Sequence, residues 1–176
     1  APLYVLSADK VSLTLAPDTV NTFTDGKAYT AAFEKQPNAC ICSRDDLVIN
    51  GTGTLNVQGN FNNGIGTKND LRIAGGVITV SAVKNALKGN DSVAIQNGAI
   101  TLTAGKDAIK ADNEDKPDKG YVYIAGGDIR ITAGDDAIQA TQDVTITGGA
   151  LTVTATGKAV NSKGSQDVAS GVINGK

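Results

Sequence analysis

Histidine, tryptophan and methionine are absent from this chain of 176 residues, and its only aromatic residues are 4 Tyr and 3 Phe. Without histidine, the protein has no Ser-His-Asp triad, no Cys-His pair, no histidine-rich zinc site and no histidine general base. The chain does have 21 Gly, together with many Thr, Val, Ile and Ala residues. This composition favours short β-strands joined by tight turns over a helical bundle.

Charge and hydrophobic runs exclude further classes of protein. The formal net charge is -2, so no basic field attracts nucleic acid and no nucleic-acid partner is expected. No apolar run approaches the ~18 residues that span a bilayer. The first residues, Ala1-Pro2-Leu3, lack the charged start of a signal peptide, so none is expected. The length predicts a single domain over residues 1–176.

The two cysteines, Cys40 and Cys42, lie two residues apart. If both belong to one strand, their side chains point the same way and their Cα atoms lie roughly 6.5–7 Å apart, a poor distance for a disulfide. We therefore expect two free thiols, buried or half-buried, rather than a disulfide or a metal site.

An internal repeat is the strongest signal in the sequence. Four segments share an Ile, a turn with Gly and an alternating strand, and they begin at Ile73, Ile95, Ile124 and Ile146. Their spacings are 22, 29 and 22 residues, and the long interval contains a seven-residue insertion over Asn113 to Lys119. Repeats of this length are typical of solenoid proteins.

Each repeat is predicted to contain three short strands, because apolar and polar residues alternate on both sides of the turn. One unit cannot bury its apolar face alone, but units stacked roughly 4.8 Å apart bury a continuous column of Ile, Val and Leu. With no room for a crossover helix, the strands must be parallel. The sequence therefore predicts an all-β, single-stranded parallel β-helix of about six coils with a ~22-residue repeat.

The two ends of the chain depart from the repeat. Residues 1–44 keep the alternation without the repeat, and we expect them to form an opening coil and a cap, while residues 45–176 form the repeated coils. The C-terminal end has no matching polar cap. This predicts either end-to-end self-association or a further domain at the C-terminal coil.

One outward column carries the candidate chemistry. Asn63, Asn85, Asp107 and Asp136 occupy equivalent positions in successive coils, each before the third strand. For the two Asn residues we expect a ladder of hydrogen bonds to backbone groups. The two Asp residues, with Asp135 beside them, bring like charges together, and such carboxylates share a proton or are bridged by a cation. Calcium, which takes six to eight oxygen ligands, suits this arrangement.

Longer motifs in the same region resemble a known family. They are Lys106 to Asp112, Lys119-Gly-Tyr, Ile124 to Gln139, Asn21 to Gly26 and Ser43 to Leu55. This pattern is similar to bacterial surface proteins called carbohydrate-binding domain-containing proteins. The resemblance implies a right-handed parallel β-helix like that of pectate lyases, calcium, and binding to plant cell-wall polysaccharides such as polygalacturonate and cellulose. It also implies an extracellular or cell-surface location. The family's motif is close to Asp-Asp-Gly-Ile, and Asp135-Asp136-Ala137-Ile138 keeps both acids.

These observations combine into one hypothesis, a non-catalytic polysaccharide-binding protein. Calcium would be held by Asp107, Asp112, Asp135 and Asp136 and would bridge to uronate carboxylates. A ligand-binding polar stripe would contain Lys88, Lys110 and Gln139. Aromatic contacts with sugar would come from Tyr121 and Tyr123, with Tyr123 pointing outward.

Four alternatives remain open at this point. A lyase of the same fold would need calcium and a base, for which Arg130 is the candidate. An inverting glycosidase would need two carboxyls roughly 6.5–9.5 Å apart, a role for Asp107 and Asp136. An ice-binding face of outward Thr pairs, which Arg130 interrupts, and a purely structural stalk are the other possibilities.

Overall fold

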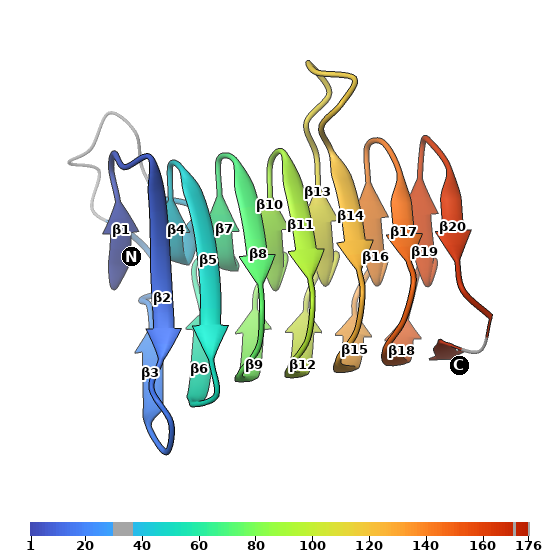
Figure 1. The fold of residues 1–176 in the computed structure, drawn as a ribbon. Helices are drawn as coiled ribbons and strands as arrows, with labels where there is room; N and C mark the ends of the chain where they lie inside the picture. The colour runs from blue at the N-terminus through green and yellow to red at the C-terminus, as the bar shows by residue number, and fades with distance from the viewer. Residues whose placement is uncertain (30–36, 171, 176) are drawn as a thin grey trace.

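A computed structural model describes residues 1–29, 37–170 and 172–175, and all regular elements in these ranges are β-strands. The strands form three parallel sheets, each of seven strands, that wind side by side along one axis (Figure 1). The two termini lie at opposite ends of the stack (Figure 1). The predicted parallel β-helix is confirmed. None of the described residues belongs to a helix long and apolar enough to cross a membrane.

We call the three sheets A, B and C in the order in which the chain visits them. Sheet A contains β1 (Leu3–Val5), β4 (Ala39–Ser43), β7 (Asn63–Thr67), β10 (Leu87–Gly89), β13 (Ile109–Ala111), β16 (Ile138–Ala140) and β19 (Val160–Ser162). Sheet B contains β2 (Lys10–Leu15), β5 (Asp46–Gly51), β8 (Asp70–Ile73), β11 (Ser92–Ile95), β14 (Tyr121–Ile124), β17 (Val144–Ile146) and β20 (Gln166–Val168). Sheet C contains β3 (Val20–Thr24), β6 (Thr54–Gly59), β9 (Val77–Ala82), β12 (Ala99–Ala104), β15 (Asp128–Ala133), β18 (Ala150–Ala155) and β21 (Ile173–Gly175).

One strand from each sheet makes one coil, so the described residues form seven coils rather than the predicted six or so. The difference lies at the N-terminus, where β1, β2 and β3 complete a coil of their own without the glycine-rich turn of the later repeats. The predicted cap region already contains β4, the first strand of the second coil. Residues 30–36 of that region lie outside the described residues.

The core consists of aliphatic columns that run along the stack. In sheet A the register places Ile41, Ile65, Leu87, Ile109 and Ile138 in one line, and each is at most 1% exposed. Sheets B and C contribute equivalent columns, so the interior is filled with branched side chains that favour the pleated surface. Burial of each such side chain contributes about 1.5–3 kcal/mol. The repeat therefore supplies the stability of the fold.

The turn from sheet B to sheet C needs a residue with positive φ in the repeated coils. Gly76, Gly98, Gly127 and Gly149 occupy this position with φ of 106°, 129°, 102° and 97°. Side chains other than that of glycine rarely adopt this conformation. The glycine-rich turns read from the sequence are therefore confirmed.

The seven-residue insertion leaves the stack at the corner between β13 and β14 (Figure 1). Asn113 anchors its base: the side-chain amide donates to Asp91 at 2.6 Å, and its oxygen accepts from the backbone of Asp115 at 2.9 Å. Lys119 ends the insertion with its ammonium 3.8 Å from Asp70 and 3.7 Å from Asp91. Strand β14 keeps its register with β11 and β17, so the insertion does not disturb the coils beside it.

The cysteines lie in β4 as free, buried thiols, as predicted. Burial raises the pKa of Cys40 to about 11, and burial also raises the pKa of Cys42. Both side chains therefore act as small apolar groups in the N-terminal part of the stack.

Candidate functional site

A ladder of Asn and Asp side chains follows the corner between sheets C and A. Asn63 begins it by donating its side-chain amide to the carbonyl of Asn38 at 2.9 Å, and its side-chain oxygen accepts from the backbone of Asn85 at 3.2 Å. The Asn85 side chain donates to the same oxygen at 3.0 Å. The ladder predicted for the two Asn residues is confirmed, and it gives buried polar groups of successive coils their partners.

The acidic half of the column continues the ladder. Asp107 accepts a hydrogen bond from the backbone of Asp136 at 3.2 Å. Asp136 in turn accepts from the backbone of Lys158 at 2.8 Å and from the side-chain amide of Asn161 at 2.6 Å. The two carboxylates are buried, with exposures of 5% and 9%. Asp107 and Asp136 thus bring carboxylate groups to this corner and also join neighbouring coils through hydrogen bonds.

Three carboxylates gather at this point of the ladder. One oxygen from each of Asp107, Asp135 and Asp136 lies within 4.8 Å of the others, and of the three only Asp135 is exposed. Oxygens on opposite sides of a calcium ion lie about 4.6–5.2 Å apart, twice the usual bond length. The donor type and the spacing therefore both suit a hard cation such as calcium.

Two lysines already balance part of this charge. The Lys110 ammonium lies 2.7 Å from Asp107, and the Lys106 ammonium lies 4.0 Å from Asp135. Lys110 is half-buried and joins the buried carboxylate, whereas Lys106 is exposed and its pairing is weak. A cation that enters the cluster must compete with Lys110 for the Asp107 carboxylate.

Asp112 is not part of the cluster, which corrects the predicted four-carboxylate set. It follows the end of β13, whereas Asp107 precedes the start of that strand. At the far end Asp112 pairs with Lys88 at 2.8 Å. The short strand between the two acids separates them along the coil.

The predicted polar stripe exists, but it is not freely exposed. Strand pairing places Lys88, Lys110 and Gln139 side by side on the outer face of sheet A. All three are half-buried, and both lysines are held in ion pairs. The side-chain oxygen of Gln139 and one of the two carboxylate oxygens of Asp112, Oδ1, are buried and have no hydrogen-bond partner among the described residues. The stripe is therefore a half-buried polar surface whose two lysines are already paired, rather than a row of exposed, unpaired cations.

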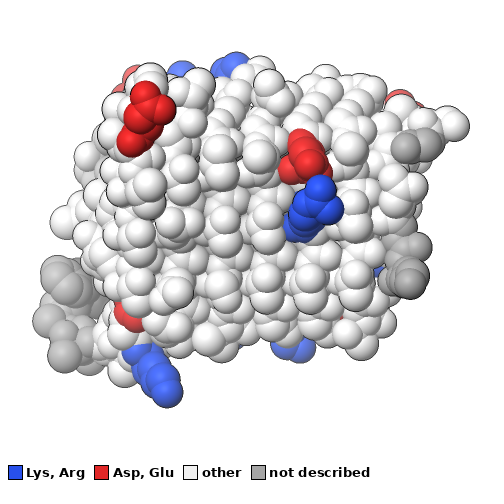
Figure 2. All heavy atoms as spheres, turned by 90° about the horizontal axis from the view of Figure 1, so that it is seen from below, with Lys and Arg blue, Asp and Glu red and all other residues white. Residues whose placement is uncertain are grey.

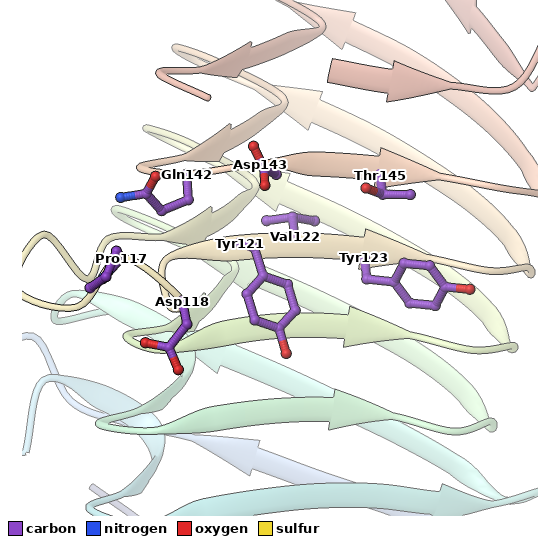
Figure 3. Close-up of a pocket in the computed structure, with 8 residues that line it drawn as sticks. All are labelled: Pro117, Asp118, Tyr121, Val122, Tyr123, Gln142, Asp143 and Thr145. Carbon is purple, nitrogen blue, oxygen red and sulfur yellow. The ribbon is translucent and has the colours of Figure 1, made fainter. Parts of the chain in front are cut away.

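Tyr123 lies on another face of the molecule and does not join the acidic cluster. Both tyrosines belong to β14 in sheet B, and Tyr123 is 36% exposed, as its predicted outward orientation requires. A hollow of about 210 Å³ lies around them, under the insertion (Figure 3). It is lined by Pro117, Asp118, Tyr121, Val122, Tyr123, Gln142, Asp143 and Thr145. Sequence reasoning missed this hollow, although two tyrosines two residues apart beside an insertion were its signal.

The outer face of sheet C is nearly free of charge. From β3 to β18 its only charged outward residues are Asp128 and Arg130, which form an ion pair at 3.3 Å. The view from below the stack accordingly shows few charged side chains (Figure 2). Thr pairs recur on this face, but the ion pair interrupts them, so a regular lattice-matching array is not formed.

The acidic cluster does not have the geometry of the glycosidase considered above. One oxygen from each of its carboxylates lies within 4.8 Å of the others, which is shorter than the roughly 6.5–9.5 Å that separate the carboxyls of inverting enzymes. Stacking in adjacent coils brings Asp107 and Asp136 too close together. Arg130, the candidate lyase base, points outward from sheet C and pairs with Asp128.

Comparison with known proteins shows a related protein and a related solved structure. A carbohydrate-binding domain-containing protein from Acetivibrio thermocellus is 55% identical over 86 residues, which cover 47% of this chain and 29% of that protein. A solved structure, described as the polysaccharide lyase-like protein from C. thermocellum in a gadolinium derivative, is 49% identical with a TM-score of 0.96. It covers 100% of this chain, and this chain covers 71% of it.

The chain thus spans less than a third of the length of the curated relative. The family of carbohydrate-binding domain-containing proteins matches residues 1–176, the full sequence. Because the match covers the whole β-helix, the chain belongs to the carbohydrate-binding domain-containing protein family.

Proposed function

We propose that this protein is a non-catalytic module that binds an acidic plant cell-wall polysaccharide, such as polygalacturonate, with the help of calcium. The observation that carries the proposal is the cluster of Asp107, Asp135 and Asp136 within 4.8 Å, in a chain of a carbohydrate-binding family. An acidic protein needs a cation to bind an acidic polymer, and calcium accepts oxygen ligands from both.

Asp107, Asp135 and Asp136 would hold the ion, and calcium would supply positive charge shared between these carboxylates and a uronate. The remaining steps belong to the chain itself. Lys110 releases Asp107, to which it lies at 2.7 Å, and its ammonium becomes free to pair with a sugar carboxylate. Lys88 and Gln139 flank it on sheet A and offer further polar contacts.

The name of the solved relative adds indirect support. That protein is described as a gadolinium derivative, and gadolinium, like calcium, is a hard cation that binds oxygen ligands. The two folds are alike, with a TM-score of 0.96, so this description is compatible with a hard cation on this fold.

The proposal of a non-catalytic role rests on the hydrogen bonds and the ion pair that the Asp107 and Asp136 carboxylates already make. Both oxygens of Asp136 accept hydrogen bonds, and those of Asp107 receive the Asp136 backbone and Lys110. Each oxygen of these two carboxylates thus already has a partner within the chain, which disfavours a role as nucleophile or proton donor. Because cell-wall polysaccharides lie outside the cell, we further propose an extracellular or cell-surface location. We also propose cellulose as a second polymer that the protein binds.

Calcium titration and polymer retention test the proposal together. We expect chelator-stripped protein to bind calcium with a dissociation constant in the micromolar to millimolar range, and polygalacturonate gels to retain the protein only when calcium is present. Asp136→Asn removes a ligand charge and should abolish both effects. Thr101→Ala, on the uncharged face of sheet C, is the matched control and should change neither.

Equal retention in excess chelator would refute the calcium-assisted mechanism. The related lyase reaction is tested separately, because it forms an unsaturated product that absorbs ultraviolet light. We expect no such absorbance from pectate incubated with the purified protein and calcium. Its appearance would overturn the non-catalytic assignment.

A further inference from the structure

On the outer face of sheet B, the strand β14 carries two large aromatic side chains where the neighbouring strand carries small ones. Strand pairing aligns Tyr121 with Ser92 and Tyr123 with Ala94 on the preceding strand. On the following strand, Thr145 stands opposite Tyr123. Two large rings therefore lie side by side on β14 between small neighbours. The small residues leave room beside each ring.

That room forms the hollow of about 210 Å³ described above. Figure 3 shows the two tyrosine rings extending from β14, with Asp118 beside Tyr121 and with Gln142 and Asp143 just before β17, the next strand of sheet B. The volume is below the ~300–1,000 Å³ of pockets that enclose a drug-sized ligand. It suits one ring of a longer chain that stays mostly in solvent.

The polar groups of the hollow are acceptors and negatively charged. The Asp118 carboxylate makes no hydrogen bond within the described part of the chain, and one oxygen of Asp143 accepts from the backbone and hydroxyl of Ser165 at 2.7 and 2.9 Å. The other oxygen of Asp143 has no such partner. No lysine or arginine lines the hollow, and the nearby Lys119 is directed to Asp70 and Asp91.

The tyrosine faces and the carboxylates of the hollow determine whether a neutral or an acidic sugar fits it. Aromatic faces suit the C–H face of a sugar ring, and carboxylates accept hydrogen bonds from its hydroxyl groups. A uronate would place its own carboxylate next to Asp118 and Asp143. The charge of the nearby Lys119 is already shared among Asp70, Asp91 and Asp118, so the like charges of the uronate and the two carboxylates repel. The hollow therefore suits a neutral sugar and disfavours an acidic one.

We propose that the hollow at Tyr121 and Tyr123 is a second carbohydrate site, which binds a neutral β-linked hexopyranose ring without calcium. The ring stacks on the tyrosines, and its hydroxyl groups donate to Asp118 and Asp143. This site lies on sheet B, whereas the acidic cluster lies at the corner between sheets C and A. The inference rests on the part of the proposed function that names cellulose, a neutral β-linked polymer, and assigns it a place on the molecule. It is independent of the calcium-dependent binding of an acidic polymer, because the two ligands differ in charge.

The test uses cellotetraose, a neutral sugar, and tetragalacturonate, an acidic one, both in excess chelator. Amide signals in the two-dimensional NMR spectrum of ¹⁵N-labelled protein report where each binds. We expect cellotetraose to shift the signals of Tyr121, Tyr123 and Asp143, and tetragalacturonate to leave them unchanged. Binding in chelator separates this result from the calcium-dependent retention, so either can fail alone.

The chain itself supplies the matched variant. The double substitution Tyr121→Ser and Tyr123→Ala introduces the residues that the preceding coil has at Ser92 and Ala94, so the fold should be kept. We expect it to weaken cellotetraose binding by at least about tenfold, while calcium binding stays at the level of the unsubstituted protein.

Asp118→Lys tests the charge preference, and it should let tetragalacturonate bind at the hollow. Thr101→Ala/Thr103→Ala on sheet C is the control and should change nothing. The proposal is overturned if cellotetraose causes no shifts at millimolar concentration, or if the double variant binds it as well as the unsubstituted protein. Equal binding of both tetrasaccharides at the hollow would also overturn it.

Discussion

Replacing Asp136 separates the structural role of the ladder from its charge. Asp136 is 9% exposed and accepts from the backbone of Lys158 at 2.8 Å and from the side chain of Asn161 at 2.6 Å. Asp136→Ala removes both acceptors and leaves the donors unsatisfied, at a cost of about 1–3 kcal/mol in the free energy of unfolding. For a chain of this size that corresponds to a melting temperature about 2–12 °C lower.

Asp136→Asn is the informative partner, because Asn63 and Asn85 fill the same ladder position in two other coils. The amide oxygen can still accept from the backbone of Lys158, and a flip of the Asn161 amide restores the second hydrogen bond. We expect a loss below about 1 kcal/mol.

Thermal melting followed by circular dichroism, in chelator, measures both variants. The order should be unsubstituted protein, then Asp136→Asn close behind, then Asp136→Ala clearly lower. If Ala melts with the unsubstituted protein, or if Asn falls as far as Ala, the ladder does not stabilise the stack as argued.

Three further predictions concern the core, the lysine and the thiols. Ile109→Ala leaves a cavity in the middle of the sheet A column and should cost about 2–5 kcal/mol in urea unfolding, against about 0.5–1.5 for Ile109→Val. Lys110→Gln removes the cation that competes at Asp107 and, if calcium binds there, should tighten calcium binding by about fivefold to thirtyfold in calorimetry, equivalent to ~1–2 kcal/mol of charge repulsion. Burial raises the pKa of Cys40 from 9.0 to about 11, so its stabilising contribution is complete below pH 9 and is lost as the pH rises towards 11. Unfolding measured from pH 8 to 11 should show this decline, and Cys40→Ala should flatten it.

Each of these has a result that contradicts it. Equal losses for Ile109→Ala and Ile109→Val would mean that the column relaxes around the cavity. Unchanged or weaker calcium binding by Lys110→Gln would remove Lys110 as a competitor. An alkaline decline that persists undiminished in Cys40→Ala would assign it to other groups, such as Tyr29, whose pKa burial and Asp25 also raise.

Much of the fold could be predicted because its information is local and repeated. The alternation of Ile and Thr fixes which side chains enter the core, and in the repeated coils the glycine before the sheet C strand fixes the turn. The alternation predicted an opening coil within residues 1–44 but not the positions of its strands, because β1 and β2 are held by register with β4 and β5, not by a turn motif of their own.

The candidate site could be predicted only in part. The repeat spacing brings Asp107 and Asp136 together, because equivalent positions of adjacent coils always stack. It does not reveal that Lys110 reaches back to Asp107, or that Asp112 faces Lys88 across the opposite end of β13. Those pairings depend on side-chain conformation at the corners, where two residues close in sequence can face different surfaces.

The hydrogen bonds that join neighbouring coils run along the long axis, and the termini lie at its two ends (Figure 1). Tension between the ends therefore acts along these hydrogen bonds. It breaks the bonds of one coil at a time rather than sliding whole sheets past one another. A coil of 22 residues would release about 70 Å of extended chain. The coil that carries the seven-residue insertion would release about 25 Å more. Pulled from its ends, the molecule should lengthen mostly in nearly equal steps, with two longer ones: one at the N-terminal coil, where Leu3 pairs with Ile41, and one that marks the insertion.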